Sequence, residues 1–268
     1  MGEITDLAGV VIKKNGTTIM SSPSIVNFTE GNYDILENPT GTLEARIQKP
    51  FDPTTDSEIF DDFISFNSGI TKFGELQWVF AYAGAVGSIT QNAYAIDVNH
   101  PGTVRLNAGS GLNADAKITG RTTDSSITYG ILGNTPNMRF VCGVASPSAS
   151  LSSKLQIIGY AESIITPAVG IYFQATDTGN WQAVTNDGTA TTSDTGVAQA
   201  TTFKRFEYLI NAAGTSVAFY IDGVLVATHT TNIPTTGLKP IFYIKTTEGV
   251  AKSLDMDYFY TKISLLNR

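Results

Sequence analysis

The chain has 268 residues, of which 42% are hydrophobic and only 15% are charged, and its formal net charge is −7. An acidic chain repels phosphate backbones, so we expect no nucleic-acid partner. The sequence contains no run of 18 apolar residues and no basic segment followed by a short apolar one, so we expect neither a membrane span nor a signal peptide.

Residues 1–50 are predicted to form a separate small β module. Short apolar strand candidates at 10–12, 25–28 and 43–47 are separated by turn sequences such as Asn15-Gly16. A module of this size without a disulfide or a metal is marginally stable alone. It can pack against the rest of the chain, or gain stability by oligomerising or docking on a partner. We favour the second alternative.

A second domain is predicted for residues 51–268. Pro50 and Pro53 mark its boundary, because a proline cannot donate a hydrogen bond to a strand ladder. The segment that starts at Thr55 and continues to Ile64 has the pattern of one short capped helix. The acidic residues near its start, Glu58, Asp61 and Asp62, are then interpreted as charges that favour the N-terminus of a helix.

The remaining sequence predicts strands rather than helices. Apolar residues alternate in short segments with turn signals every 8–12 residues, a spacing typical of sandwiches and jelly rolls. The segments are 76–82, 94–98, 103–106, 116–118, 127–132, 138–144, 155–160, 169–173, 181–185 and 203–265. The only cysteine, Cys142, lies in such a segment. We expect an inert core thiol in a protein made in a reducing cytoplasm, with no disulfide and no cysteine-cluster metal site.

The C-terminal segment gives the clearest strand signals. Asp222-Gly223 between two apolar alternations predicts a hairpin with a type I′ turn, in which both central residues have positive φ. In the last strand, 254–263, the alternation places Tyr258 and Tyr260 with the apolar residues on one face. Asp255 and Asp257 then lie on the other face.

Candidate catalytic and metal-binding residues are few. Asp255 and Asp257 lie two positions apart on one strand face, so the pair can be read as catalytic, as calcium-binding, or as a solvated face with a capping carboxylate, which we favour. His100 and His229 have no partner at zinc-ligand spacing and are interpreted as structural. No Gly-x-Ser-x-Gly elbow and no nucleotide-binding loop is present. We therefore expect no catalytic residues, no metal and no cofactor.

Aromatic side chains are candidates for contact with a sugar or another subunit. Trp78 is expected in the core, whereas Trp181 follows a turn and can be either core or surface. Tyr172 and Tyr220 alternate with their strands' main apolar residues, so each can face another sheet, a neighbouring subunit or a sugar.

Several short segments, in this order, resemble a concanavalin-like jelly-roll module of tailed-bacteriophage structural proteins. The resemblance covers about residues 55–265 and rests on the segments 99–106, 170–173, 179–183, 219–229, 232–234 and 254–259. The segments 14–17 and 25–28 resemble short β repeats of phage fibres. The resemblance implies an all-β fold, a concanavalin or laminin G-like jelly-roll sandwich preceded by the small N-terminal β module. Hydrolases of that fold carry a Glu-x-Asp-x-x-Glu strand, which this sequence lacks.

We therefore expect a virion structural protein and not an enzyme. In this interpretation the N-terminal module attaches a head-decoration, head-fibre or tail-appendage subunit to a capsid or tail protein. The subunit is expected to be a homotrimer at the virion surface, made in the host cytoplasm. The alternative is a lectin-like protein that binds a host-surface glycan, and a hydrolase is a third, more distant reading.

Overall fold

The computed structural model divides the chain into two compact units, Met1–Pro53 and Thr54–Arg268. It describes residues 56–63, 72–74, 76, 78–84, 87–91, 100, 102–120, 131–147, 151–162 and 167–264, and the backbone of four strands in the first unit. These four strands form two antiparallel hairpins, β1 (Val11–Lys14) with β2 (Thr17–Ser21), and β3 (Tyr33–Glu37) with β4 (Leu43–Ile47). The predicted attachment role of this unit stays a prediction.

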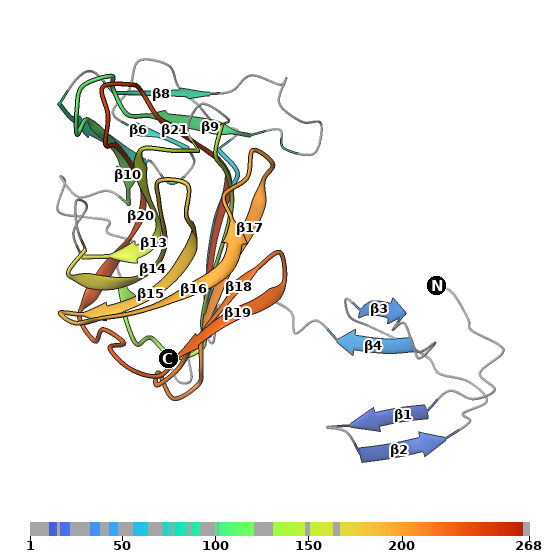
Figure 1. Cartoon of the computed structure of the whole chain (residues 1–268). Helices are drawn as coiled ribbons and strands as arrows, with labels where there is room; N and C mark the ends of the chain where they lie inside the picture. The colour runs from blue at the N-terminus through green and yellow to red at the C-terminus, as the bar shows by residue number, and fades with distance from the viewer. Residues whose placement is uncertain are drawn as a thin grey trace. The chain divides into compact units, whose positions relative to one another are not determined.

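The second unit contains two antiparallel sheets (Figure 1). The first sheet has the order β16 (Ala190–Ala198), β15 (Asn180–Asp187), β14 (Val169–Thr176), β13 (Lys154–Ala161), β20 (Gly237–Thr246), β10 (Asp115–Thr119), β7 (Trp78–Ala83) and β6 (Lys72–Phe73), with β11 (Ile131–Leu132) also paired to β20. The second sheet has the order β19 (Val224–His229), β18 (Val217–Ile221), β17 (Lys204–Ile210), β12 (Met138–Ala145), β21 (Ser253–Ser264), β9 (Val104–Asn107) and β8 (Ser88–Gln91), with β5 (Asp56–Asp61) also paired to β21.

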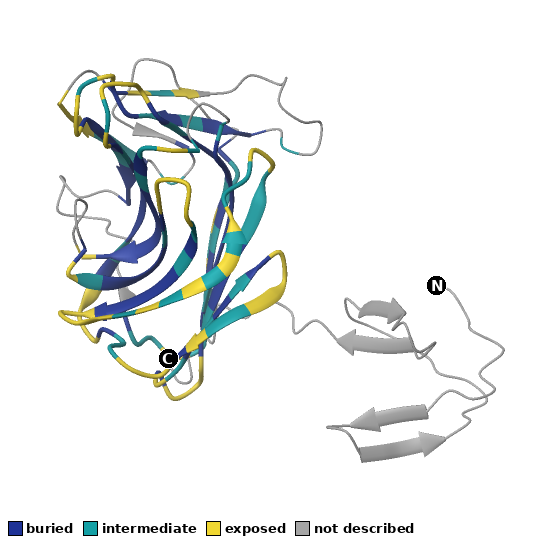
Figure 2. Cartoon of the chain, in the orientation of Figure 1, coloured by how far each residue is buried: buried dark blue, intermediate teal, exposed yellow. Residues whose placement is uncertain are grey.

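The two sheets enclose one main hydrophobic core. Large aromatic side chains dominate it, and their burial supplies much of the driving force for folding. Phe140 from the second sheet stacks on Tyr208 with ring centroids 4.8 Å apart, and Trp78 from the first sheet meets Phe259 edge to face at 4.9 Å. Figure 2 shows buried residues along the facing strands and exposed residues at the turns. The predicted all-β sandwich is confirmed.

The short helix predicted around residues 55–64 is wrong, because this segment forms strand β5. Pairing with β21, which places Phe60 opposite Tyr260, outweighs the local capping signal. Asp61 is therefore not a helix-terminal charge. Its buried carboxylate accepts hydrogen bonds from the backbone N–H of Phe63 (2.8 Å) and of Leu76 (3.0 Å), and from Nε1 of Trp78 (2.9 Å).

Several other strand predictions are confirmed. Asp222 and Gly223 have φ values of 51° and 80°, as the predicted type I′ turn requires.

The segment 94–98 and most of 127–132 lie outside the described residues. Strand β16 was missed, because its sequence is rich in threonine and lacks an apolar alternation. In the described part of the chain, no helix is long and apolar enough to cross a membrane.

Candidate functional site

The outer face of the second sheet, which points away from the core, carries a row of large side chains. The strand register aligns Phe60, Tyr260, Val141, Glu207 and Tyr220 across β5, β21, β12, β17 and β18. Phe60 is 53% exposed, so the row reaches solvent at its β5 end. Two members of the row differ from the sequence prediction, which places Phe60 in a helix and Tyr260 on the opposite face of its strand.

An irregularity in the β12–β21 pairing explains this error. The register shifts between Cys142 and Val144, a β-bulge that interrupts the strict alternation. Met256 therefore faces the core before the shift and Phe259 faces it after, whereas Tyr258 and Tyr260 point outward. The sequence prediction that both tyrosines share the face of Met256 is wrong for this reason.

The missing side chain of Gly143 makes room for one of these tyrosines. A Cβ on Gly143 would lie 2.9 Å from Cε1 of Tyr258, closer than real contacts allow. Burial raises the pKa of Tyr258 to about 12, so its phenol keeps its proton at neutral pH. The bulge and the glycine together hold an aromatic ring and a hydroxyl at the surface of the sheet.

Two arginines are fixed beside these rings by one buried carboxylate. Nε of Arg139 donates to Oε1 of Glu207 at 2.7 Å, and a terminal nitrogen of Arg205 contacts the other oxygen, Oε2. The Glu207 side chain is 9% exposed, whereas those of Arg139 and Arg205 are 41% and 39% exposed. Charge-assisted hydrogen bonds of this kind hold the guanidinium groups in place while leaving them accessible.

These side chains line a shallow depression of about 210 Å³, which we call the outer-face hollow. Its lining consists of Phe60, Arg139, Val141, Arg205, Tyr258 and Tyr260. Ligand sites typically combine apolar and aromatic walls with a few fixed polar groups, and this lining has both. Its volume is below the roughly 300–1,000 Å³ of sites for drug-sized ligands. The hollow therefore suits one ring or the end of a larger ligand.

The three aromatic candidates from the sequence lie in different places. Tyr220 is half-buried beside Glu207, next to the outer-face hollow. Tyr172 lies on the outer face of the first sheet, but it is 4% exposed and its hydroxyl donates to the carbonyl of Pro167 at 3.4 Å. Trp181 is 2% exposed and packs edge to face on Phe206 in the core. Of the three, the structure therefore places only Tyr220 on the face that carries the hollow, outside its lining, and removes Trp181 as a surface contact.

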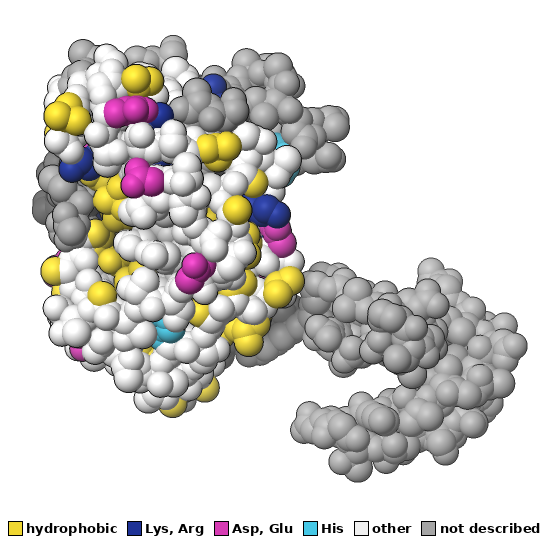
Figure 3. Space-filling model, in the orientation of Figure 1, with side chains coloured by type: hydrophobic (Ala, Val, Ile, Leu, Met, Phe, Trp, Pro, Cys, Tyr) yellow, Lys and Arg dark blue, Asp and Glu magenta, His cyan; other side chains and the backbone are white. Residues whose placement is uncertain are grey.

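The outer face of the first sheet is largely apolar at its centre. Ile157, Tyr172, Val184, Ile241 and Tyr243 belong to a second buried cluster, separate from the main core. Figure 3 shows that much of the visible surface is uncharged.

Among the described strand residues whose position in the alternation places them on that face, the carboxylates are Asp115 on β10 and Asp194 on β16. Five strand intervals separate these two strands, or about 24 Å at roughly 4.8 Å per interval. Glycoside hydrolysis by a carboxylate pair needs roughly 5–9.5 Å. These two residues cannot act as such a pair.

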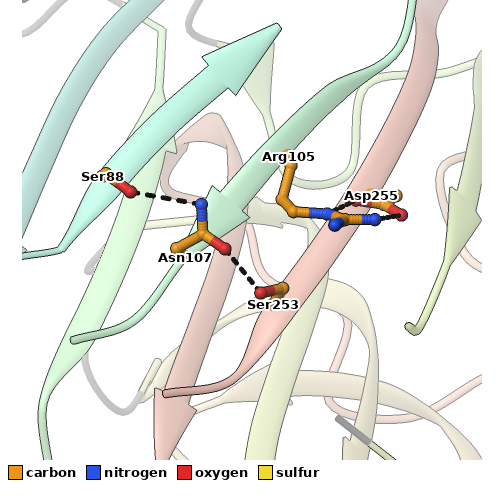
Figure 4. Close-up of polar contacts among 5 residues, drawn as sticks. All are labelled: Ser88, Arg105, Asn107, Ser253 and Asp255. Atoms are coloured by element: carbon orange, nitrogen blue, oxygen red, sulfur yellow. Dashed lines mark hydrogen bonds and ion pairs between the residues drawn. The ribbon is translucent and has the colours of Figure 1, made fainter. Parts of the chain in front are cut away.

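Asp255 and Asp257 are close together, but each already has a partner. Asp255 accepts two 2.7 Å hydrogen bonds from Arg105 (Figure 4), and Oδ2 of Asp257 lies 2.6 Å from Nδ1 of His100. Figure 4 also shows Asn107 between Ser88 and Ser253, which links β8, β9 and β21. The pair is thus part of the structure of the sheet, and the solvated face favoured from the sequence is wrong, because both carboxylates are buried.

His229 joins the edges of the two sheets. Its Nδ1 lies 3.0 Å from Oγ1 of Thr185, and its Nε2 lies 3.0 Å from Oγ of Ser193. The Thr185 hydroxyl donates to the carbonyl of Thr231, so Nδ1 is the donor to Thr185 and Nε2 accepts from Ser193. Burial lowers the pKa of His229 and keeps it neutral. A threonine cannot stabilise an imidazolium as a carboxylate does, so we assign this contact a structural role.

Cys142 is buried in the core, and burial raises the pKa of its thiol well above the usual value. The predicted inert core thiol is confirmed. Among the described residues, no group of three or more histidine, cysteine, aspartate or glutamate side chains is arranged to hold a metal ion.

Sequence reasoning missed the two arginines of the hollow, Arg139 and Arg205, and Glu207, which holds both in place. A signal was present, because Arg205 and Glu207 lie two positions apart in a strand whose other face is apolar. Two residues at this spacing share a face, so a charged pair was predictable. Their partner Arg139 depends on the pairing of β12 with β17, which no local pattern reveals.

Comparison with solved structures identifies the fold. A protein of unknown function, SO2946 from Shewanella oneidensis MR-1, matches with a TM-score of 0.54 and 14% identity, covering 79% of this chain and 88% of that one. The Emp47p carbohydrate recognition domain matches with a TM-score of 0.53 and 10% identity over 81% and 100% of the two chains. A β-glucanase from Bacillus licheniformis matches with a TM-score of 0.50 and 16% identity, covering 76% of this chain and 97% of that one. The predicted concanavalin-like jelly roll is confirmed.

The expectation that the chain is not an enzyme is corrected by the same comparison. The similar structures include glucanases, so this jelly roll is one on which glycoside hydrolases are built. The absence of one hydrolase motif was too narrow a basis for excluding enzymatic activity. At 16% identity or less, these similarities show the fold alone. None of the structures named here is described as a bacteriophage protein.

Sequence comparison identifies the family more directly. A search of curated proteins found no significant match. A family model described as SO2946-like, C-terminal domain, matches residues 99–257, which is more than half of the chain. The chain therefore belongs to the SO2946-like C-terminal domain family.

Proposed function

We propose that this chain binds carbohydrate and that the outer-face hollow holds a sugar ring. The observation that carries the proposal is the combination of one exposed and two half-buried aromatic rings with two guanidinium groups fixed by Glu207. Aromatic faces pack against the apolar faces of sugar rings, and arginine N–H groups donate to hydroxyl oxygens. The similar fold of a carbohydrate recognition domain supports this reading at the level of fold.

A glycan array followed by calorimetry on the full chain tests the proposal. Phe60→Ala and Tyr260→Ala remove parts of the wall, and we expect each to weaken binding without unfolding the protein, because neither side chain is in the core. Tyr82→Ala is the matched control, since Tyr82 is a similarly exposed aromatic residue, 49% exposed, on the first sheet. An array without binding, or binding unchanged by both wall variants, contradicts the proposal.

We also propose that the chain is displayed on a virion, where the first unit attaches a homotrimer to a capsid or tail protein. The division into two units, each with its own sheets, supports a separate attachment module. Light scattering is expected to give three times the 28.6 kDa chain mass. Deleting residues 1–50 is expected to abolish particle binding while sparing sugar binding. A stable monomer, or unchanged attachment after the deletion, contradicts this role.

A further inference from the structure

The two arginines at the outer-face hollow retain unused hydrogen-bond donors. A guanidinium group carries five N–H donors. Arg139 reaches Glu207 through Nε, and Arg205 does so through one terminal nitrogen. Each therefore presents further N–H groups at the rim of the hollow, held in position by a carboxylate that is itself almost buried.

Two described carboxylates on the strands that carry the hollow already have a partner. Oε1 of Glu58 lies 2.7 Å from Nζ of Lys262, and Asp257, which is not part of the lining, faces His100. The lining itself contains two arginines and no acidic residue, and the arginines share the single carboxylate of Glu207. In a chain with a net charge of −7, this lining has the opposite character to the protein as a whole.

We propose that the hollow selects a sugar that carries an anionic group beside its ring. The ring packs between Tyr258, Tyr260 and Phe60, and the anionic group accepts hydrogen bonds from Arg139 or Arg205. This inference rests on the carbohydrate-binding function proposed above. The fork of a guanidinium group matches carboxylate and sulfate alike, so the shared chemistry is a planar or tetrahedral oxyanion, and the experiment separates the two sources.

Matched ligands test the selection directly. Calorimetry on the full chain would compare oligogalacturonate with its methyl ester, which keeps the rings and removes the charge, and with a sulfated neutral oligosaccharide. Loss of a charge-assisted hydrogen bond is expected to weaken binding roughly 10- to 100-fold on esterification. If only the sulfated oligosaccharide binds, the anionic group that the hollow selects is a sulfate. Equal affinity for acid and ester overturns the anionic selection while carbohydrate binding stands. No binding by any sugar, here or on the array, overturns the function itself.

Variants assign the effect to the arginines. In Arg139→Gln and Arg205→Gln, each checked for folding by urea denaturation, we expect the affinity difference between acid and ester to shrink in at least one variant. Phe60→Ala is the control, because it is expected to weaken both ligands equally. Arg139→Lys keeps the charge but loses the fork, so it is expected to retain only part of the difference. A preference for the acid that survives both Gln variants contradicts the assignment.

Discussion

Gly143 on β12 lies directly against the ring of Tyr258 on β21, where an added Cβ would approach Cε1 to 2.9 Å. We therefore expect Gly143→Ala to lower the free energy of unfolding by about 1–3 kcal/mol through overpacking. Urea denaturation measures this change. Gly237→Ala is the control, because nothing lies within 4 Å of a Cβ there. In a Tyr258→Ala background, Gly143→Ala is expected to cause a smaller decrease in the free energy of unfolding. An unchanged decrease would show that a contact other than the one with Tyr258 is responsible.

Asp61→Asn is expected to destabilise the second unit. The carboxylate accepts three hydrogen bonds through both oxygens, and an amide nitrogen in place of either oxygen leaves at least one N–H donor facing another donor. An unpaired buried donor costs about 1–3 kcal/mol. Asp187→Asn, at an exposed turn, is expected to stay within about 0.5 kcal/mol of the wild type.

The difference in stability between the wild type and Asp61→Asn is expected to depend on pH in one direction. Burial raises the pKa of Asp61 above 3.8, so between 3.8 and the folded pKa the folded state binds more protons than the unfolded state. The free energy of unfolding then falls as pH rises through this window. The advantage of the wild type over Asp61→Asn should therefore be larger at pH 4 than at pH 7. An advantage that grows with pH would contradict the pKa direction.

Lys154→Met is expected to stabilise the protein. The Lys154 side chain is fully buried, its Nζ has no hydrogen-bond partner, and burial together with the nearby charge of Lys252 lowers its pKa to about 7. Burying this amine is unfavourable at pH 7, and each pKa unit corresponds to about 1.4 kcal/mol. We expect Lys154→Met to raise the free energy of unfolding by more than about 1.4 kcal/mol at pH 7.

The gain from Lys154→Met should shrink as the pH rises from 7 to 10.5, because over that range the unfolded chain gives up the proton that the folded wild type has already lost. Guanidinium denaturation at several pH values measures both effects. Lys204→Met removes a partly exposed ion pair with Asp222 and is expected to cost only about 0–1 kcal/mol. A destabilising Lys154→Met would show that the amine has a stabilising partner.

His229→Gln is expected to make the free energy of unfolding depend less on pH under mildly acidic conditions. Burial lowers the pKa of His229 below 6.5, so at mildly acidic pH the unfolded state binds the extra proton and the folded state does not. The free energy of unfolding of the wild type should fall between pH 7 and pH 5 more steeply than that of the variant. Parallel curves for the two proteins would show that His229 does not titrate differently on folding.

The sequence predicted the sandwich well because its strands are short, alternating and separated by recognisable turns. Phe206, Tyr208 and Ile210 face the core as their spacing requires, and the Asp222-Gly223 turn has the expected backbone. The same local reasoning failed where tertiary pairing decides the outcome. Strand β5 contradicts a good helix-capping pattern because β21 offers it a ladder of hydrogen bonds.

The candidate site was less predictable than the fold. One shift in register at Gly143 turns Tyr258 and Tyr260 outward. The sequence of their own strand, β21, does not predict this shift. Trp181 follows a turn in the sequence, but it points into the core and packs on Phe206 of the facing sheet. Pairing across strands therefore determines which aromatic residues reach the surface.

The carboxylate of Asp61 has a mechanical consequence. Asp61 is the last residue of β5, the first strand of the sandwich, and its Oδ2 accepts a hydrogen bond from Nε1 of Trp78 in the opposite sheet. Tension along β5 would load its ladder with β21, and the bond from Trp78 adds an attachment to the other layer at the end of that ladder. The end of β5 is thus tied to both sheets, to β21 by strand pairing and to β7 by the side-chain hydrogen bond.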